Sequence, residues 1–263
     1  MDGRTLQDLQ FARIVEAASS RSQTARGRAL LATLRELPGP AAAKTELVLV
    51  DQAAALLALP DHPTLDGVED VGSQVESAAR GGVLTAAELV ACARLLRRAH
   101  EAFSLLADLR LRAPELAASF GNVKDHLAIA ERIEETFDED NRIRDDASPR
   151  LGELRSRVVH LGRRVKERIE SMLRDPAVRE VLQDDYYTLR EGRYVLPVRA
   201  EDHRFVPGII HGTSRTGATH FVEPAAIVDD NNQLKLVLDQ IEVEEYAVLA
   251  DRSGLIGRFA PET

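Results

Sequence analysis

The sequence predicts a mainly α-helical protein with a small β-module, an α+β fold in which two long antiparallel helices carry a group of short strands. One seven-residue apolar repeat begins at residue 147 and a second begins near residue 227. Between them the apolar pattern changes from a helical period to an alternating one. We therefore expect the two helices to pair antiparallel, with the strands at their tip.

Helix breakers divide the first 110 residues into a series of helices; they are Ser19-Ser20, Pro38-Gly39-Pro40, Pro60 to Pro63 and Gly81-Gly82. The clearest helix begins at Thr85, which forms a capping box with Glu88. Its apolar seam is Leu89, Cys92, Leu96, Ala99, Phe103 and Leu106. Steps of three and four place this seam on one face, so we expect Cys92 to be a packed core thiol rather than a nucleophile.

The first long helix is predicted over residues 147–175. Ser148 supplies an N-cap hydroxyl and Pro149 suits the first helical position, while Pro176 disfavours continuation. The apolar seam is Ala147, Leu151, Leu154, Val158, Leu161, Val165 and Met172, with Arg168 as its polar member.

The second long helix is predicted to begin near Pro224 and to return along the first. Its seam is Ile227, Asn231, Leu234, Leu238, Ile241, Glu245 and Val248. A polar Asn231 in such a seam favours a register-setting residue over a ligand.

The segment between the helices predicts four strands. Residues 186–190 and 193–199 alternate around Glu191-Gly192, which is typical of a β-hairpin. Two more strands are predicted at 206–211 and 218–222, joined by a turn of small and Gly residues at 212–217.

Composition limits the class of protein. The hydrophobic fraction of 44% and the charged fraction of 29% suit a globular chain, and no apolar run approaches the roughly 20 residues of a membrane span. The first residues lack the apolar core of a secretory signal, and the single cysteine allows no internal disulfide. We therefore expect a cytoplasmic protein without a membrane partner.

Charge is unevenly distributed along the chain. The net charge of −9 argues against a surface that binds nucleic acid everywhere. Between Pro149 and Arg174, however, eight basic residues stand against three acidic ones. The segment 149–174 of this acidic protein is thus locally basic.

No catalytic signature is found in the sequence. It lacks the phosphate-binding loop GxxxxGK[ST], a GxGxxG after a strand, HExxH and GxSxG. The acidic cluster at 138–146 lacks the spacing of an EF-hand loop and favours a solvated turn. The histidines at 203, 211 and 220 could bind zinc only if they converged, which their spacing does not indicate. We expect no enzyme activity, no metal and no cofactor in this chain.

Arginines concentrate in the β-module: Arg190, Arg193, Arg199, Arg204 and Arg215, beside Thr213, Ser214 and Thr216 of the turn. These side chains commonly contact phosphates. Arginines on exposed strands are also ordinary solubility features, and the residues alone leave both interpretations open.

Three strings carry a resemblance to a known family: RYVLPVRAE (193–201), PGIIHGTSRTGATHFVEP (207–224) and Asn231-Asn232. They resemble the clamp region of bacterial MutS-related proteins, above all the second type, the endonuclease MutS subfamily. The strings LQFARIVEAASS (9–20), GGVLTAAEL (81–89) and IRDDASPRLGELR (143–155) look like earlier pieces of the same proteins.

The resemblance implies a helical core at 1–146, an outgoing lever helix at 147–175, a clamp at 176–223 and a returning lever helix at 224–263. In that family the returning lever leads to an ABC-type ATPase domain, often followed by a small nuclease domain. The sequence ends at Thr263 before any ATPase motif, so ATP and magnesium are expected only in that missing part of the parent protein.

The resemblance also implies a function, which is gripping the backbone of branched or duplex DNA without reading its sequence, within a recombination or repair ATPase. The candidate contact residues are Arg199, Arg204, Arg215, Thr216, Arg190, Arg193 and Lys166. The alternative is an interaction scaffold, whose seams and tip serve a homodimer or contacts with the ribosome in a quality-control role.

Overall fold

The computed structural model describes residues 3–60, 62, 64–65, 67–108, 113–119 and 125–259. It divides the chain into two compact units. The core unit contains residues 1–144 and 249–263, and the paired-helix unit contains residues 145–248. Helices dominate both, and the strands described form one small antiparallel sheet, so the predicted α+β class is confirmed.

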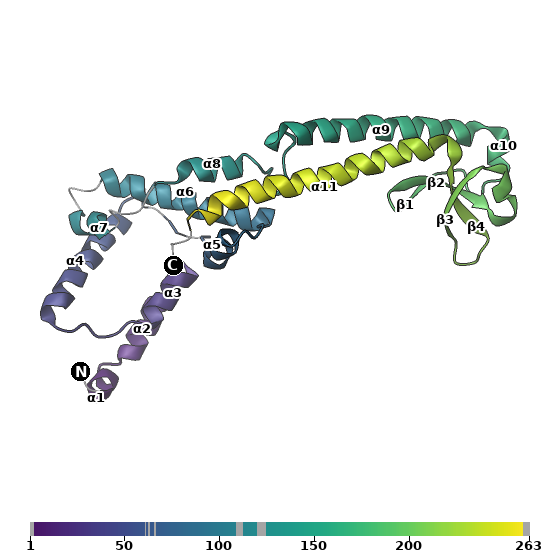
Figure 1. Cartoon of the computed structure of the whole chain (residues 1–263). Coiled ribbons are helices and arrows are strands. Elements are labelled where there is room, and N and C mark those ends of the chain that lie inside the picture. The colour runs from purple at the N-terminus through teal and green to yellow at the C-terminus, as the bar shows by residue number, and fades with distance from the viewer. Residues whose placement is uncertain are drawn as a thin grey trace. The chain divides into compact units, whose positions relative to one another are not determined.

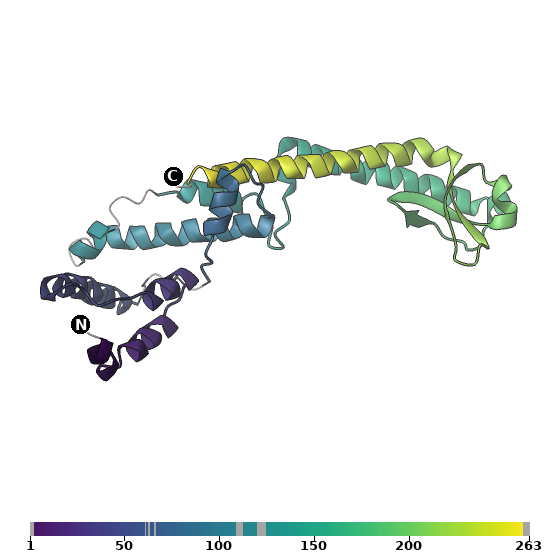
Figure 2. The same ribbon diagram turned by 60° about the horizontal axis from the view of Figure 1, so that its bottom comes forward.

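The core unit is helical. Its described helices are α1 (Gly3–Asp8), α2 (Phe11–Ser20), α3 (Ala25–Ala32), α4 (Pro40–Leu57), α5 (Gly72–Ala79), α6 (Ala86–Asp108), α7 (Pro114–Ser119), α8 (Leu127–Glu134) and the last part of α11 (Val228–Gly257). Side chains from α6, α8 and α11 form its buried centre; Leu89, Ala130, Ile133 and Ile256 are at most 2% exposed. Figure 2 shows α6 and α8 next to each other in this unit.

The predicted start of α6 is confirmed. The backbone N–H of Thr85 donates to the carboxylate of Glu88 at 2.9 Å, and the N–H of Glu88 donates to the Thr85 hydroxyl at 3.4 Å. Cys92 is 2% exposed, as expected of a core thiol, and burial raises its pKa to about 11. The side chain of Leu106, predicted in the same seam, and Pro63 of the predicted breaker lie outside the described residues.

The first helices of the core unit are loosely covered. The structure buries no described residue of α2, α3 or α4. Large apolar side chains there remain open to solvent, among them Leu30, Leu47 and Leu57, which are 66%, 60% and 59% exposed.

The paired-helix unit alternates helices with strands. Its described elements are η1 (Asp145–Ala147), α9 (Pro149–Arg174), α10 (Pro176–Arg179), β1 (Thr188–Arg190), β2 (Arg193–Arg199), η2 (Ala200–Phe205), β3 (Gly208–Thr213), β4 (Thr219–Pro224), η3 (Ala225–Ile227) and the first part of α11. Figures 1 and 2 both show α9 and α11 running alongside each other, with the sheet at the end where α9 stops and α11 starts.

The caps of α9 explain its limits. The hydroxyl of Ser148 accepts a hydrogen bond from the N–H of Leu151 at 3.1 Å, as expected of an N-cap. At the far end the chain turns at Asp175, and Pro176 begins the short helix α10 with Asp175 as its N-cap. Sequence reasoning placed the end of α9 correctly but did not expect α10.

The seam of α9 departs from prediction near its end. Ile169 is fully buried, whereas Arg168, the predicted seam member, is about half exposed. A straight α-helix has 3.6 residues per turn, so a strict seven-residue repeat drifts around its surface by about 20° per heptad. The drift brings Ile169 to the core and turns Arg168 toward the side of α11.

The sheet has the strand order β1-β2-β4-β3, with every neighbouring pair antiparallel. Glu191 and Gly192 join β1 to β2 with φ values of 50° and 77°, as a two-residue hairpin turn requires. One face packs on α9 and α11 through a continuous core that contains Val165, Ile169, Leu196, Val198, Val222, Ile227 and Leu234. The predicted hairpin and the two further strands are confirmed, with β3 beginning at Gly208 because residues 200–205 form the short helix η2.

Within the part of the chain that the structure describes, no helix combines the length and the apolar character that crossing a membrane would need.

Candidate nucleic-acid interface

One end of the sheet carries Arg199 and the turn that contains Arg215 and Thr216. Here Arg199 at the end of β2 pairs with Thr219 at the start of β4. The short helix η2 follows β2, and the turn 214–218 precedes β4. Both segments therefore leave the sheet at the same end. We call residues 200–205 and 214–218 the tip.

The turn of the tip is held by its own hydrogen bonds. The N–H of Ser214 donates to the carbonyl of Thr219 at 2.8 Å, and the N–H of Gly217 donates to the carbonyl of Ser214 at 2.9 Å. Gly217 has a φ of 76°, which favours glycine. These bonds fix the backbone and leave Arg215 and Thr216 exposed between them.

The short helix η2 is held against the strands from both sides. Arg199 donates to the carboxylate of Asp202 at 2.8 Å and also to the carbonyl of Glu180. The ring of His203 meets the ring of His220 edge to face, with centroids 5.4 Å apart. Arg204 and Phe205 project from a fixed backbone as a result.

The candidate contact residues fall into two groups. Arg204, Arg215 and Lys166 are exposed, and within the described part of the chain no carboxylate forms an ion pair with any of them. The hydroxyl of Thr216 is exposed and lies 3.3 Å from that of Ser214. These side chains can meet a ligand without first breaking an ion pair.

The other three candidates already have partners in the protein. The Arg190 guanidinium lies over the ring of Phe221, 4.0 Å from the centroid. Arg193 donates to Glu223 at 2.8 Å and to Asn232 at 2.7 Å. Arg199 is bound to Asp202, as described above. Their donors are largely committed to holding the module together.

The positive charge of the basic residues on α9 is also partly neutralised. Half of its eight basic residues form ion pairs with acids of η1 or α11: Arg150 with Glu244, Arg155 with Asp145 and Glu245, and Arg164 and Arg168 with Asp230. The carboxylate of Asp230 is 5% exposed and lies 2.6 Å from each of its two arginines. The local excess seen in the sequence is therefore smaller in the folded unit.

Lys166 lies on α9 beside a groove of about 750 Å³ between α9, β1 and α11. Apolar side chains line much of the groove, among them Val158, Leu234 and Leu238. Glu167 and Glu170 also line it and reduce the positive charge that Lys166 brings.

Histidines of the β-module do not come together as a group. His203 faces His220, whereas His211 is hydrogen-bonded to the buried carboxylate of Glu223. Across the described residues, no three His, Cys, Asp or Glu side chains are arranged to hold a metal ion.

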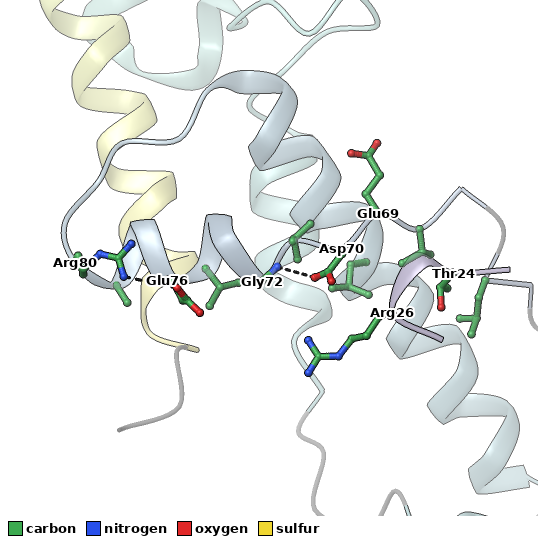
Figure 3. Close-up of a pocket in the computed structure, with 13 residues that line it drawn as sticks. Thr24, Arg26, Glu69, Asp70, Gly72, Glu76 and Arg80 are labelled. Carbon is green, nitrogen blue, oxygen red and sulfur yellow. Dashed lines mark hydrogen bonds and ion pairs between the residues drawn. The ribbon is translucent and has the colours of Figure 1, made fainter. Parts of the chain in front are cut away.

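A cavity in the core unit has a different character. It measures about 1010 Å³ and is lined by residues of α3, α5 and the segment before α5. Figure 3 shows Asp70 accepting a hydrogen bond from the N–H of Gly72, at 3.0 Å, and Glu69 pointing away from Arg26. Its charged groups do not converge on one point, so the cavity offers no catalytic arrangement.

Several known proteins similar to this chain are named endonuclease MutS2. Endonuclease MutS2 of Anaeromyxobacter sp. is 36% identical over 256 residues, which cover 97% of this chain and 32% of the relative. Endonuclease MutS2 of Symbiobacterium thermophilum is 34% identical over 262 residues, with coverage of 97% and 32%. Nearly the whole chain is therefore similar to part of endonuclease MutS2. It spans about a third of the length of these MutS2 relatives. No family model matches the chain.

Sequence reasoning missed two features of this surface. One is Asp230, whose carboxylate neutralises Arg164 and Arg168; the only signal was its position next to Asn231 in the returning seam. The other is Phe205 at the end of η2, whose side chain is 71% exposed.

Proposed function

We propose that the tip of the paired-helix unit binds the phosphate backbone of DNA, duplex or branched, without reading its sequence. The observation that carries this proposal is the contrast among the arginines of the unit. Arg204 and Arg215 at the tip are exposed without a carboxylate partner in the described chain, whereas most arginines on α9 and β2 have one. Cations free of internal partners are the ones that can replace the counterions of a phosphate chain.

Neighbouring groups at the tip suit the same ligand. The hydroxyls of Ser214 and Thr216 lie beside Arg215, and hydroxyls and guanidinium groups are common phosphate donors. The hydrogen-bonded turn holds these donors in place before a ligand arrives, which lowers the entropy lost on binding. The name of the relatives, endonuclease, supports a nucleic acid as partner.

The wider role is proposed from the family. In this proposal the chain is part of a MutS-type recombination or repair ATPase of the cytoplasm, and ATP, magnesium and the nuclease chemistry belong to other residues of the parent protein. The sequence of this chain contains no GxxxxGK[ST] loop.

An interaction scaffold is the second candidate function, and one observation favours it. Exposed apolar side chains line one side of α11, where Leu236, Val243 and Tyr246 are 61%, 68% and 61% exposed. Such a stripe can pair with another protein surface, either in a homodimer or on a ribosome. Sedimentation of the chain alone, and with ribosomes, separates these partners from DNA.

Fluorescence anisotropy with a labelled duplex and a four-way junction, each at two salt concentrations, tests the DNA proposal. We expect Arg204→Ala with Arg215→Ala to weaken binding to both. The slope of log K against log salt should fall by up to about 1.8, since each phosphate contact on duplex DNA contributes about 0.9.

A matched variant separates a local contact from a change in net charge. Arg35→Ala with Lys44→Ala removes the same charge from exposed positions of the core unit. We expect its affinity to stay within about twofold of the wild type, because neither residue belongs to the proposed contact surface. Absence of binding at low salt, or equal loss in both double variants, contradicts the proposal.

A further inference from the structure

Apolar side chains open to solvent are concentrated at the start of the core unit. Half of the large apolar side chains that remain exposed in the described part of the chain lie between residues 9 and 65. The structure buries no described residue of α2, α3 or α4. Soluble proteins rarely leave large contiguous apolar areas in water unless another surface binds there. These three helices therefore have the composition of a contact surface.

Helix α4 has one packed side and one open apolar side. Four exposed apolar residues lie at steps of three and four, which places them on one side of the helix. They are Leu47, Val50, Ala54 and Leu57. Gln52 lies on the opposite side, where its side chain accepts a hydrogen bond from the N–H of Leu116 in α7 at 2.9 Å. The apolar stripe is thus the side of α4 that faces away from α7.

The cavity of about 1010 Å³ in the core unit adjoins these helices. Its apolar lining includes Leu65, Val68 and Leu95. Arg26 of α3 and Gly72 of α5, both drawn in Figure 3, line it as well. Packed protein interiors contain few voids larger than a water molecule. An open apolar space of this size next to exposed apolar helices indicates a place where a further element packs.

The last part of α11 ends beside the wall of this cavity. A Cβ at Gly257, the last residue of α11, would come within 2.6 Å of the carbonyl oxygen of Ala78 in α5. Glycine therefore permits a close approach of the two helices. The next residue of α5, Ala79, lines the cavity. Residues that follow α11 in a longer chain start next to the cavity.

The lengths of the relatives select the occupant of this surface. The chain covers 32% of endonuclease MutS2 from Anaeromyxobacter sp. and 32% of that from Symbiobacterium thermophilum. About two thirds of each relative thus lies outside the matched residues. That length is sufficient for one or more further domains.

We propose that the open apolar sides of α2, α3 and α4, together with the adjoining cavity, form the docking surface on which the rest of a MutS2-length parent chain packs against the core unit. The charged residues of α4 are Lys44, Glu46 and Asp51, so the surface that meets the stripe is chiefly apolar. This surface belongs to the core unit, and its role does not depend on DNA binding by the tip.

Hydrogen–deuterium exchange compares this chain with the full-length Anaeromyxobacter relative. Protection factors, which are corrected for sequence, are measured for α2, α3 and α4 and for the aligned segments of the relative. Each is divided by the protection factor of α8, which contains the buried Ala130 and Ile133. We expect this ratio to be at least about 100-fold higher in the relative, because a covered surface opens less often. An equal ratio in the two proteins overturns the proposal.

Cross-linking of the full-length relative identifies what covers the surface. An equal mixture of unlabelled and isotope-labelled protein distinguishes links within one chain from links between two copies. We expect links within one chain, from the segment aligned with α4 to residues outside the matched 256. Links from that segment only to a second copy, or only to other matched residues, overturn the proposal.

A variant of the 263-residue chain tests whether the stripe is open in this chain. Leu47→Gln with Leu57→Gln makes the stripe polar with a residue that also favours helices. We expect the melting temperature and the sedimentation coefficient to stay unchanged, because this chain does not bury these side chains. The matched control is Leu236→Gln with Val243→Gln, which changes exposed positions of α11 and should also have no effect.

Two results of this comparison contradict the proposal. A sedimentation coefficient that falls in the α4 variant alone assigns the stripe to a second copy. A melting temperature that falls in the α4 variant alone shows that the stripe is already packed within this chain.

Discussion

The guanidinium of Arg193 on β2 donates a hydrogen bond to the fully buried carboxylate of Glu223 on β4, with 2.8 Å between Nη1 and Oε1. Asn231 of α11 donates to the same oxygen at 2.8 Å and accepts from the backbone N–H of Tyr194 at 3.2 Å. One network thus joins β2, β4 and α11 and fixes where the returning helix meets the sheet.

Replacing Arg193 by Met should destabilise the paired-helix unit by about 3 kcal/mol, because it leaves a buried carboxylate without its strongest partner. His211 and Asn231 still contact Glu223 and keep the loss at the low end of the range for broken buried pairs. Urea denaturation monitored by circular dichroism measures the change. The double variant with Glu223→Gln should recover part of the loss, and an Arg193→Met protein as stable as the wild type would falsify the assignment.

Asp230→Asn should lower the free energy of unfolding by about 2 kcal/mol, because one of the two oxygens that accept from Arg164 and Arg168 becomes an NH2 group that cannot accept, and the other loses its negative charge. The arginines are about half exposed, so solvent screening keeps the effect modest. Asp229→Asn changes the exposed neighbouring residue and should cost only a few tenths of a kcal/mol. Equal effects of the two substitutions would argue against the ion pairs.

Ser253→Ala should destabilise the core unit by about 1–3 kcal/mol. The Ser253 hydroxyl accepts a hydrogen bond from the backbone N–H of Leu84 at 2.8 Å in a buried position, and alanine leaves that N–H unsatisfied. Thermal denaturation of Ser253→Ala and of Ser171→Ala, which alters an exposed serine, measures the difference. A similar loss of thermal stability in both variants would show that the hydrogen bond from Leu84 to Ser253 does not have this stabilising role.

Cys92 should make stability fall at high pH. Burial, followed by the charge of Glu88, raises the pKa of the thiol to about 11, so the native state favours the protonated form. That contribution is complete below the pKa of the unfolded thiol and disappears as pH rises through about 11. The stability difference between the wild type and Cys92→Ala, measured from pH 8 to about 11, should shrink with rising pH, and a constant difference contradicts the shift.

Glu201→Gln should strengthen DNA binding by severalfold at low salt and less at high salt. Its carboxylate is exposed on η2 beside Arg204, and a negative charge there repels phosphates. Anisotropy titrations at two salt concentrations give the ratio. Asp184→Gln removes an exposed carboxylate from the segment before β1 and serves as the control, with little change expected.

Local signals explain what could be predicted from the sequence. Thr85 with Glu88, Ser148 with Pro149, and Glu191-Gly192 each act over a few residues, so the helix starts and the hairpin could be located without the fold. The burial of Ile169 in place of Arg168 in the seam of α9 could not be predicted in this way. It depends on how far a seven-residue repeat drifts around a straight helix.

The charge of the site was harder to predict, because it depends on contacts distant in sequence. The partner of Arg164 is 66 residues away, and that of Arg193 is 30 residues away. Counting charges along α9 therefore overestimated the free basic surface. Roles of the seven candidate contact residues stay predictions, since only binding measurements test them.

Helices α2, α3 and α4 bury no described residue and should unfold locally more readily than α9. In α9 the buried residues are Leu151, Leu154, Val165 and Ile169. Amide hydrogens of α2, α3 and α4 should exchange with solvent through small local openings, whereas exchange of those in α9 requires a larger unfolding event. Proteases should cut among the early helices first. The melting curve of the whole chain would then contain more than one transition, and a single midpoint temperature would describe neither part.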